Sequence, residues 1–405
     1  MTRKARTSPT ERKGRTTPRG GPSTSVSGGT LDIDRLLADR KTEIIVCCGS
    51  GGVGKTTTAA ALGLRAAEQG RNVCVLTIDP ARRLAQSMGL TELDNTPRPV
   101  KDIGNSGGTL DAMMLDMKRT FDEVVEQQAS PEKAAQILNN PFYVALSSSF
   151  AGTQEYMAME KLGQLHRQAV NEARTWDLII VDTPPSRSAL DFLDAPERLS
   201  SMLDGRFIKL LLAPAKGPAR LLSAGFGIVT NALNKVLGAQ VLTDMQTFVA
   251  AFDTLFGGFR QRADSTYALL QAEETAFLVV AAPESAAMRE ASYFVERLAE
   301  EQMPLAGLVI NRVHENGADG ITAADAESAG RKLEGGDASD KVTADLLAVH
   351  AEGIRVSARE TRLKKGFTAA HPGVATVSVA ALAGDVHDLD GLREIGELLA
   401  GPAES

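Results

Sequence analysis

The chain has 405 residues, of which 43% are hydrophobic, and a formal net charge of −7. This length is enough for one large or two ordinary domains with a sizeable core. The acidic balance and an aromatic content of only 4% argue against a nucleic-acid partner bound by charge or by base stacking. Neither an apolar run of about 18 residues nor a secretory signal pattern occurs, so we expect a cytoplasmic protein with at most peripheral membrane contact.

The first 30 residues differ in composition from the rest of the chain. They are rich in Ser, Thr, Gly and Pro, and Glu11 is their one acidic residue, against Arg3, Lys4, Arg6, Arg12, Lys13, Arg15 and Arg19. This composition predicts a disordered, solvated tail over residues 1–30. A polybasic arm that contacts anionic lipid or RNA is the alternative. We therefore expect one folded domain over residues 31–405.

The first apolar strand, residues 44–48, leads into a glycine-rich loop. Residues 49–57 fill the phosphate-loop pattern G-x-x-x-x-G-K-[ST], and an Ala-rich helix follows over residues 58–68. Such a loop points several backbone N–H groups at one place, and the helix dipole favours an anion there. We expect Lys55 to reach the β- and γ-phosphates of a nucleotide and the hydroxyl of Thr56 to hold Mg²⁺. The phosphate-binding residues are then Gly51, Gly52, Val53, Gly54, Lys55, Thr56 and Thr57.

Cysteine and histidine usage argues against a zinc site. Cys47, Cys48 and Cys74 are the only cysteines, and all three fall in predicted buried strands. They are expected to act as small hydrophobic side chains in a reducing compartment. The five histidines show no ligand spacing, so we predict no zinc.

Further apolar strands are predicted over residues 72–79, 177–182, 276–281 and 305–311. Strands that alternate with helices predict an α/β fold, a mostly parallel sheet between helices. Ligands of such sheets bind at the carboxyl ends of the strands, where Asp79, Asp182 and Asn311 fall.

Two of these residues are acids with a possible role in nucleotide hydrolysis. Asp79 ends its strand in a position that suits a carboxylate that orients water or accepts a proton, and Asp182 ends an apolar strand, as Mg²⁺-binding acids do. Residues 183–186 then form a loop that could sense the γ-phosphate. The alternative is that each Asp is a cap or turn residue, which is common for a single acid but less so for two beside a phosphate loop.

Three stretches interrupt the alternation of strands and helices. Residues 116–170 are amphipathic and residues 195–260 are markedly more apolar, so both are expected to be helical insertions in the domain. Residues 313–345 are acidic and rich in Gly, Ala and Asp, and predict a mobile surface loop.

Taken together, these motifs resemble the arsenite-pump ATPase family, which includes the ATPases that target tail-anchored membrane proteins. Four motifs occur in the family's order: the loop at residues 49–57, residues 77–81 as switch I, residues 182–189 as switch II, and Asn311. The resemblance covers about residues 41–400 and is strongest to actinobacterial anion-transporting ATPases. It implies a P-loop NTPase fold, ATP and Mg²⁺ as ligands, and a dimer. It also implies that Asp79 orients the attacking water and that Asn311 reads adenine.

The resemblance extends to two further segments. Residues 151–155 are similar to the helical-domain segment that contacts the switch, and residues 379–389 to the late loop that closes over adenine.

The chain departs from the family pattern at two positions. Ser50 replaces a lysine that in the family reaches across a dimer to the partner's nucleotide, and Ser188 replaces the switch II histidine. Either the protein is a weak ATPase or nucleotide-gated binder, or it pairs with a paralogue that keeps the lysine. We favour the heterodimer over a homodimer because the other catalytic positions are retained. The C-x-x-C of the eukaryotic targeting factors is also absent, so we expect a dimer held without zinc.

Three functions follow from the resemblance. The favoured one is an ATPase whose switches move a helical subdomain that binds or hands over hydrophobic membrane-protein helices, although the apolar insertion could instead be core or dimer interface. The second is the catalytic subunit of an arsenite-like anion pump, against which the lack of any cysteine after Cys74 weighs. The third is a positioning ATPase of the MinD/ParA type, against which the acidic C-terminal helix over residues 390–399 weighs.

Overall fold

The computed structural model describes residues 29–79, 83–104, 107–141, 143–144, 147, 153–171, 175–184, 258, 261–314 and 320–401. Most of the predicted tail and, except for residue 258, the predicted insertion at residues 195–260 lie outside these residues. The domain boundaries and the tail therefore stay predictions.

In the described residues, eight strands form one sheet in the order β3-β4-β2-β5-β1-β6-β7-β8. All neighbouring strands are parallel except the short antiparallel pair of β3 and β4. The prediction of an α/β fold with a mostly parallel sheet is confirmed. The strands are β1 Ile44–Cys48, β2 Asn72–Thr77, β3 Arg98–Pro99, β4 Thr109–Met114, β5 Leu178–Asp182, β6 Thr275–Ala281, β7 Leu305–Val313 and β8 Thr376–Ala380.

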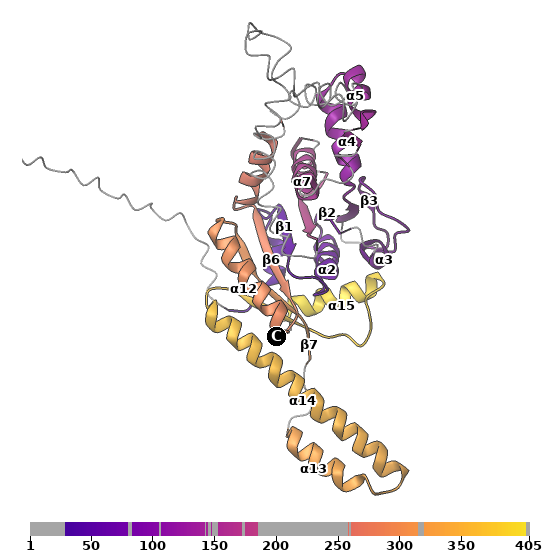
Figure 1. Cartoon of the computed structure of the whole chain (residues 1–405), viewed down its shortest axis with the longest axis vertical. Helices are drawn as coiled ribbons and strands as arrows, with labels where there is room; N and C mark the ends of the chain where they lie inside the picture. Colours follow the sequence, from indigo (N-terminus) through magenta and orange to yellow (C-terminus); the bar gives the residue numbers. More distant parts are fainter. Residues whose placement is uncertain are drawn as a thin grey trace, which may run out of the picture.

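Helices cover both faces of this sheet (Figure 1). Alternation along β1 supplies both cores, because Ile44, Val46 and Cys48 join one buried cluster while Ile45 and Cys47 join the other. One cluster takes in α1 Ile33–Ala38, α2 Lys55–Glu68, α3 Arg83–Ser87 and α15 Leu389–Ala400. The opposite cluster takes in α4 Met117–Gln128, α5 Pro131–Leu138, α7 Thr153–Asn171, α12 Ser285–Glu300 and part of α14 Ala338–Ala370.

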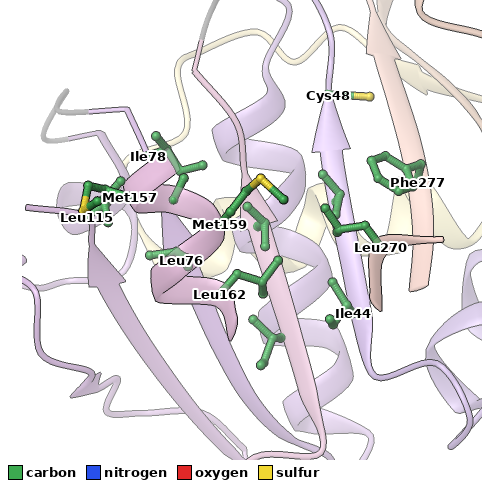
Figure 2. Close-up of a cluster of buried hydrophobic side chains, with 14 of the residues drawn as sticks. Ile44, Cys48, Leu76, Ile78, Leu115, Met157, Met159, Leu162, Leu270 and Phe277 are labelled. Atoms are coloured by element: carbon green, nitrogen blue, oxygen red, sulfur yellow. The ribbon is translucent and has the colours of Figure 1, made fainter. Parts of the chain in front are cut away.

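Figure 2 shows the second cluster where α7 lies against the sheet. Met159 and Leu162 of α7 belong to the same buried cluster as Ile44 of β1 and Phe277 of β6. Helices α4 and α5, and all of α7 except its last residue, fall within residues 116–170, the first stretch that predicted a helical insertion. This cluster therefore joins those helices to the strands that carry the loop at residues 49–54.

The three cysteines have the role that their sequence context predicts. Cys47, Cys48 and Cys74 are free thiols, buried in β1 and β2. Burial raises the pKa of the Cys48 thiol to about 12, which keeps it a neutral packing group at ordinary pH.

The prediction of a surface loop over residues 313–345 is wrong for most of that range. The structure has α13 Ala323–Leu333 there and begins α14 at Ala338, and the two helices pack together as a hairpin that projects from the sheet (Figure 1). The Asp residues that looked typical of a loop are helix caps, since Asp325 and Asp340 complete capping boxes with Thr322 and Asp337. Alanine, the best helix former, occurs at seven positions of residues 313–345.

Across the described ranges, none of the helices combines the length and apolar character needed to cross a bilayer.

Candidate functional site

The carboxyl ends of four strands bring the predicted site residues to one edge of the sheet. These strands lie near one another in the sheet, where the order is β2-β5-β1-β6-β7. The glycine-rich loop follows β1, Asp182 ends β5, Asp79 comes two residues after β2, and Asn311 lies near the end of β7. Parallel strands end at the same edge, so the fold itself gathers these residues.

Two glycines of the loop have no room for a side chain. Gly49 has a φ of +150°, and a Cβ there would lie 2.1 Å from the carbonyl oxygen of Val280 in β6. Gly54 has a φ of +93°, and a Cβ there would lie 2.2 Å from the side-chain nitrogen of Asn311. Glycine at these positions lets the loop lie directly on β6 and β7.

Helix α2 begins at Lys55 with Gly54 as its N-cap, and no side chain caps its first amides. The first N–H groups of a helix have no partner within the helix, and the helix dipole makes this end positive. A glycine loop that leads into an uncapped helix N-terminus is a fitting cradle for a phosphate group.

Lys55 is folded back onto this loop. Its side chain is only 5% exposed, and Nζ donates a hydrogen bond of 2.8 Å to the carbonyl oxygen of Ser50. Burial lowers the pKa of Lys55, while the nearby charges of Asp182 and Asp79 raise it. Position 50 thus contributes its backbone carbonyl to the lysine.

Asp182 is fully buried beneath the loop and joins two other elements. Its Oδ2 accepts hydrogen bonds from the hydroxyls of Thr56 in α2, at 2.7 Å, and Thr77 in β2, at 2.8 Å. Its Oδ1 is buried and receives no hydrogen bond from the described residues. Burial raises the pKa of Asp182 to about 6, although the two hydroxyls and Lys55 act to lower it.

The hydroxyl of Thr56 and the carboxylate of Asp182 fit a magnesium ion. Both are hard oxygen donors, which Mg²⁺ prefers, and Mg²⁺ commonly takes one or two protein ligands and completes its shell with water and phosphate. A buried carboxylate oxygen without a partner is the kind of atom that a bound ion or its water would satisfy. The structure places Thr56 and Asp182 in contact; the metal role itself stays a prediction.

Asp79 lies close enough to these groups to act on them electrostatically. Its negative charge raises the pKa values of both Asp182 and Lys55. Its backbone N–H donates to the Thr77 hydroxyl at 3.2 Å, the same hydroxyl that donates to Asp182. The Thr77 hydroxyl therefore links the backbone of Asp79 to the carboxylate of Asp182, a role that the sequence alone does not indicate.

Asn311 and its neighbour Arg312 approach the loop from β7. The Asn311 side chain is buried, and its Nδ2 donates to the carbonyl oxygen of Val53 at 2.9 Å. Arg312, which sequence reasoning missed, donates from Nη1 to the carbonyl oxygen of Gly52 at 3.0 Å. The only sequence signal for Arg312 is its position next to Asn311 at a strand end.

Part of the predicted switch II lies outside the described residues. Residues 185–190, including Ser188, are not described, and neither are residues 80–82 or 148–152. Thr183, at the start of this segment, is buried and donates from its hydroxyl to the carbonyl oxygen of Cys47 at 2.9 Å.

No group of three or more His, Cys, Asp or Glu side chains in the described part of the chain is arranged to hold a metal ion. The expectation that the protein uses no zinc remains a prediction.

A family of known proteins is similar to this chain in sequence. The model of the family described as "Anion-transporting ATPase" matches residues 42–327, a range that includes every site residue named above.

Individual relatives have low sequence identity to this chain, but the matched regions are long. The chain is 26% identical over 266 residues to "ATPase ASNA1 homolog" of Cryptosporidium parvum, covering 65% of this chain and 63% of that protein. It is 24% identical over 288 residues to "ATPase get3" of Schizosaccharomyces japonicus, covering 70% and 78%. It is 23% identical over 396 residues to "ATPase BagA" of Mycobacterium tuberculosis, covering 93% and 98%. The chain thus spans less than two thirds of the first of these relatives and nearly all of the third.

The buried carboxyl of Asp182 predicts a stability that depends on pH. Its folded pKa of about 6 is above the ordinary value of 3.8, so the folded chain binds this proton more tightly than the unfolded chain. Its contribution to stability is therefore present at low pH and is lost as the pH rises through about 4 to 6. We expect Asp182→Asn to raise the unfolding free energy of the nucleotide-free protein at pH 8 by about 1–3 kcal/mol.

Denaturant unfolding at pH 8 and at pH 5, without nucleotide or Mg²⁺, measures this effect. The gain should shrink markedly at pH 5, where the wild-type carboxyl is mostly protonated. A variant that is destabilised equally at both pH values would contradict this prediction, because an effect of the Asp182 charge must differ between pH 5 and pH 8.

Proposed function

The chain belongs to the anion-transporting ATPase family, and we propose that it binds ATP with Mg²⁺ at the loop over residues 49–57 and hydrolyses it. The observation that carries this proposal is the contact of Thr56 with the buried carboxylate of Asp182 at the base of the loop, beside the buried Lys55. A merely structural turn has no need for a buried lysine, a buried acid and an uncapped helix end in one place.

Each group then has a distinct task. The amides at the start of α2 and the ammonium of Lys55 hold the phosphates, and Thr56 and Asp182 hold Mg²⁺. Bound Mg²⁺ supplies positive charge that offsets the negative charge of the phosphates. Lys55 is already buried, so losing water to the phosphates costs it little further desolvation.

Asp79 is our candidate for the residue that orients the attacking water. It is half-buried at the end of β2, and its backbone is tied through Thr77 to the buried Asp182. A carboxylate held at a fixed position can accept a hydrogen bond from water and take up a proton as the bond to the phosphate forms.

We further propose that Asn311 contacts the adenine. Its buried amide lies against Val53 and Gly54, so a nucleotide whose phosphates occupy the loop would extend along this side of the sheet edge. The segment that follows β8, within residues 379–389, is the candidate for closing over the base.

The serine at position 50 supports a role in a pair of subunits. In this family a lysine at that position reaches the partner's nucleotide, and here the position offers a carbonyl to Lys55 but no charge of its own. We propose a heterodimer in which a lysine-retaining paralogue completes the site of this chain; a homodimer with low activity is the alternative.

The work driven by hydrolysis is, in our proposal, the binding or transfer of a hydrophobic helix of a membrane protein. Family membership and the apolar sequence of residues 195–260 support this substrate class. The described part of the site does not depend on it, so the client and the ATPase activity can be tested separately.

Replacing Lys55 and Asp79 should separate binding from hydrolysis. We expect Lys55→Ala to abolish measurable ATP binding, because it removes the cation that faces the phosphates. We expect Asp79→Asn to keep ATP affinity within about threefold but lower the turnover number by roughly 10²-fold or more. Isothermal titration and a phosphate-release assay measure the two effects, with the exposed Lys341→Ala as the control. Unchanged binding in Lys55→Ala would contradict the proposed site.

Restoring a lysine at position 50 tests the missing charge. We expect Ser50→Lys to raise the turnover of the isolated chain by at least about tenfold, since a cation supplied across an interface contributes roughly 10³–10⁵ in related phosphoryl-transfer sites. Phosphate release should be measured with the oligomeric state, from light scattering, at the same concentration. A dimer with unchanged turnover would show that the absent lysine is not limiting.

A hydrophobic helix should be captured in one nucleotide state only. We expect a photo-crosslinkable peptide of about 20 apolar residues to be retained with ATP in the Asp79→Asn variant and released with ADP, with a scrambled polar peptide as control. Equal capture in both nucleotide states, or none, would reject the client proposal and leave the ATPase proposal intact.

A further inference from the structure

Arg312 has an unusual backbone conformation for its residue type. Its φ is +59°, in the left-handed region that non-glycine residues adopt at a cost in energy. The Oδ1 of Asn311 accepts the backbone N–H of Arg312 at 3.0 Å and so helps to hold this conformation. The strand is irregular at the same place, since the pairing of β7 with β8 shifts register between Ile310 and Val313.

This kink places two consecutive side chains on the same loop. In a regular strand, neighbouring side chains point to opposite faces of the sheet. Here Asn311 donates to the carbonyl oxygen of Val53 at 2.9 Å while Arg312 donates to that of Gly52 at 3.0 Å. The end of β7 therefore donates hydrogen bonds to the carbonyl groups of two successive residues of the phosphate loop. Irregularities of this kind are common beside functional sites, where they redirect a side chain.

The guanidinium of Arg312 brings a positive charge to a loop that lacks one at position 50. The Arg312 side chain is exposed, and within the described ranges no carboxylate lies in ion-pair contact with it. A guanidinium has several N–H donors, and the bond to Gly52 occupies one of them. None of the described carboxylates therefore competes with a polyanion at the loop for the remaining donors and the charge.

We propose that Arg312 is a nucleotide-positioning residue. Its hydrogen bond fixes the outer part of the loop at Gly52, and its charge favours the triphosphate over the diphosphate. This inference rests on the proposed binding of ATP at the loop. ATP carries one more negative charge than ADP, so a cation beside the loop discriminates between them, whereas a purely structural clamp would affect both alike.

The test compares ATP and ADP affinities of three variants at position 312. We expect Arg312→Ala to weaken ATP binding by about tenfold and ADP binding by no more than about threefold. Arg312→Lys should restore the preference for ATP because it keeps the charge. Arg312→Gly should behave like Arg312→Ala, because relief of the left-handed backbone does not replace the guanidinium. Titration with a fluorescent nucleotide, in competition with ATP or ADP, gives both affinities.

Two controls keep the outcomes separate. Arg331→Ala, an exposed arginine on α13, should leave both affinities unchanged, and thermal unfolding without nucleotide shows whether each variant is folded. If Arg312→Ala is unfolded, Arg312→Lys is compared with Arg312→Gln, which keeps a donor for Gly52 but no charge.

If Arg312→Ala weakens ATP and ADP binding equally, or weakens neither, the proposed role of Arg312 is overturned. The proposed site itself would still be supported if the wild-type chain binds ATP and the Lys55→Ala variant does not. Failure of the wild-type chain to bind ATP would instead overturn the proposed function.

Discussion

The site depends on one buried interaction, the hydrogen bonds that Asp182 accepts from Thr56 and Thr77. They join the end of β5 to the start of α2 and to the end of β2. Burying a carboxylate is costly, and the raised pKa of Asp182 records that cost. A chain selected for stability alone would place an apolar residue here. The polar arrangement is understandable if the site is completed by a ligand that satisfies the remaining carboxylate oxygen.

The rest of the architecture serves this arrangement. Parallel strands deliver the loop, the two acids and Asn311 to one edge, and glycine at positions 49 and 54 lets the loop lie against β6 and β7 without a clash. Buried clusters pack against both faces of the sheet, so the phosphate loop follows a strand that is enclosed on both sides. The left-handed backbone of Arg312 is held by the hydrogen bond of its N–H to the Asn311 side chain and by that of its guanidinium to Gly52.

Much of the fold and the site could be predicted from sequence because the signals were local. Apolar runs identified β1, β2, β5, β6 and β7, and the glycine pattern identified the loop. Strands β3, β4 and β8 are not predicted, because β3 has only two residues and because Asp111 and Ser378 interrupt the apolar character of the other two. The hairpin of α13 and α14 was taken for a loop because Asp residues that cap helices also occur in turns.

Thr77 and Arg312 could not be assigned because their roles depend on contacts made across the sheet, between residues far apart in the chain.

In our proposal, Thr56 and Asp182 together hold the metal of a nucleotide bound at the loop. A crystal structure with Mg²⁺ and a non-hydrolysable ATP analogue tests it most directly. We expect the metal on the Thr56 hydroxyl, with the Asp182 carboxylate bound to it directly or through one water, and the triphosphate along residues 51–57. A triphosphate bound elsewhere, or a metal with no contact to either side chain or its water, would contradict the account.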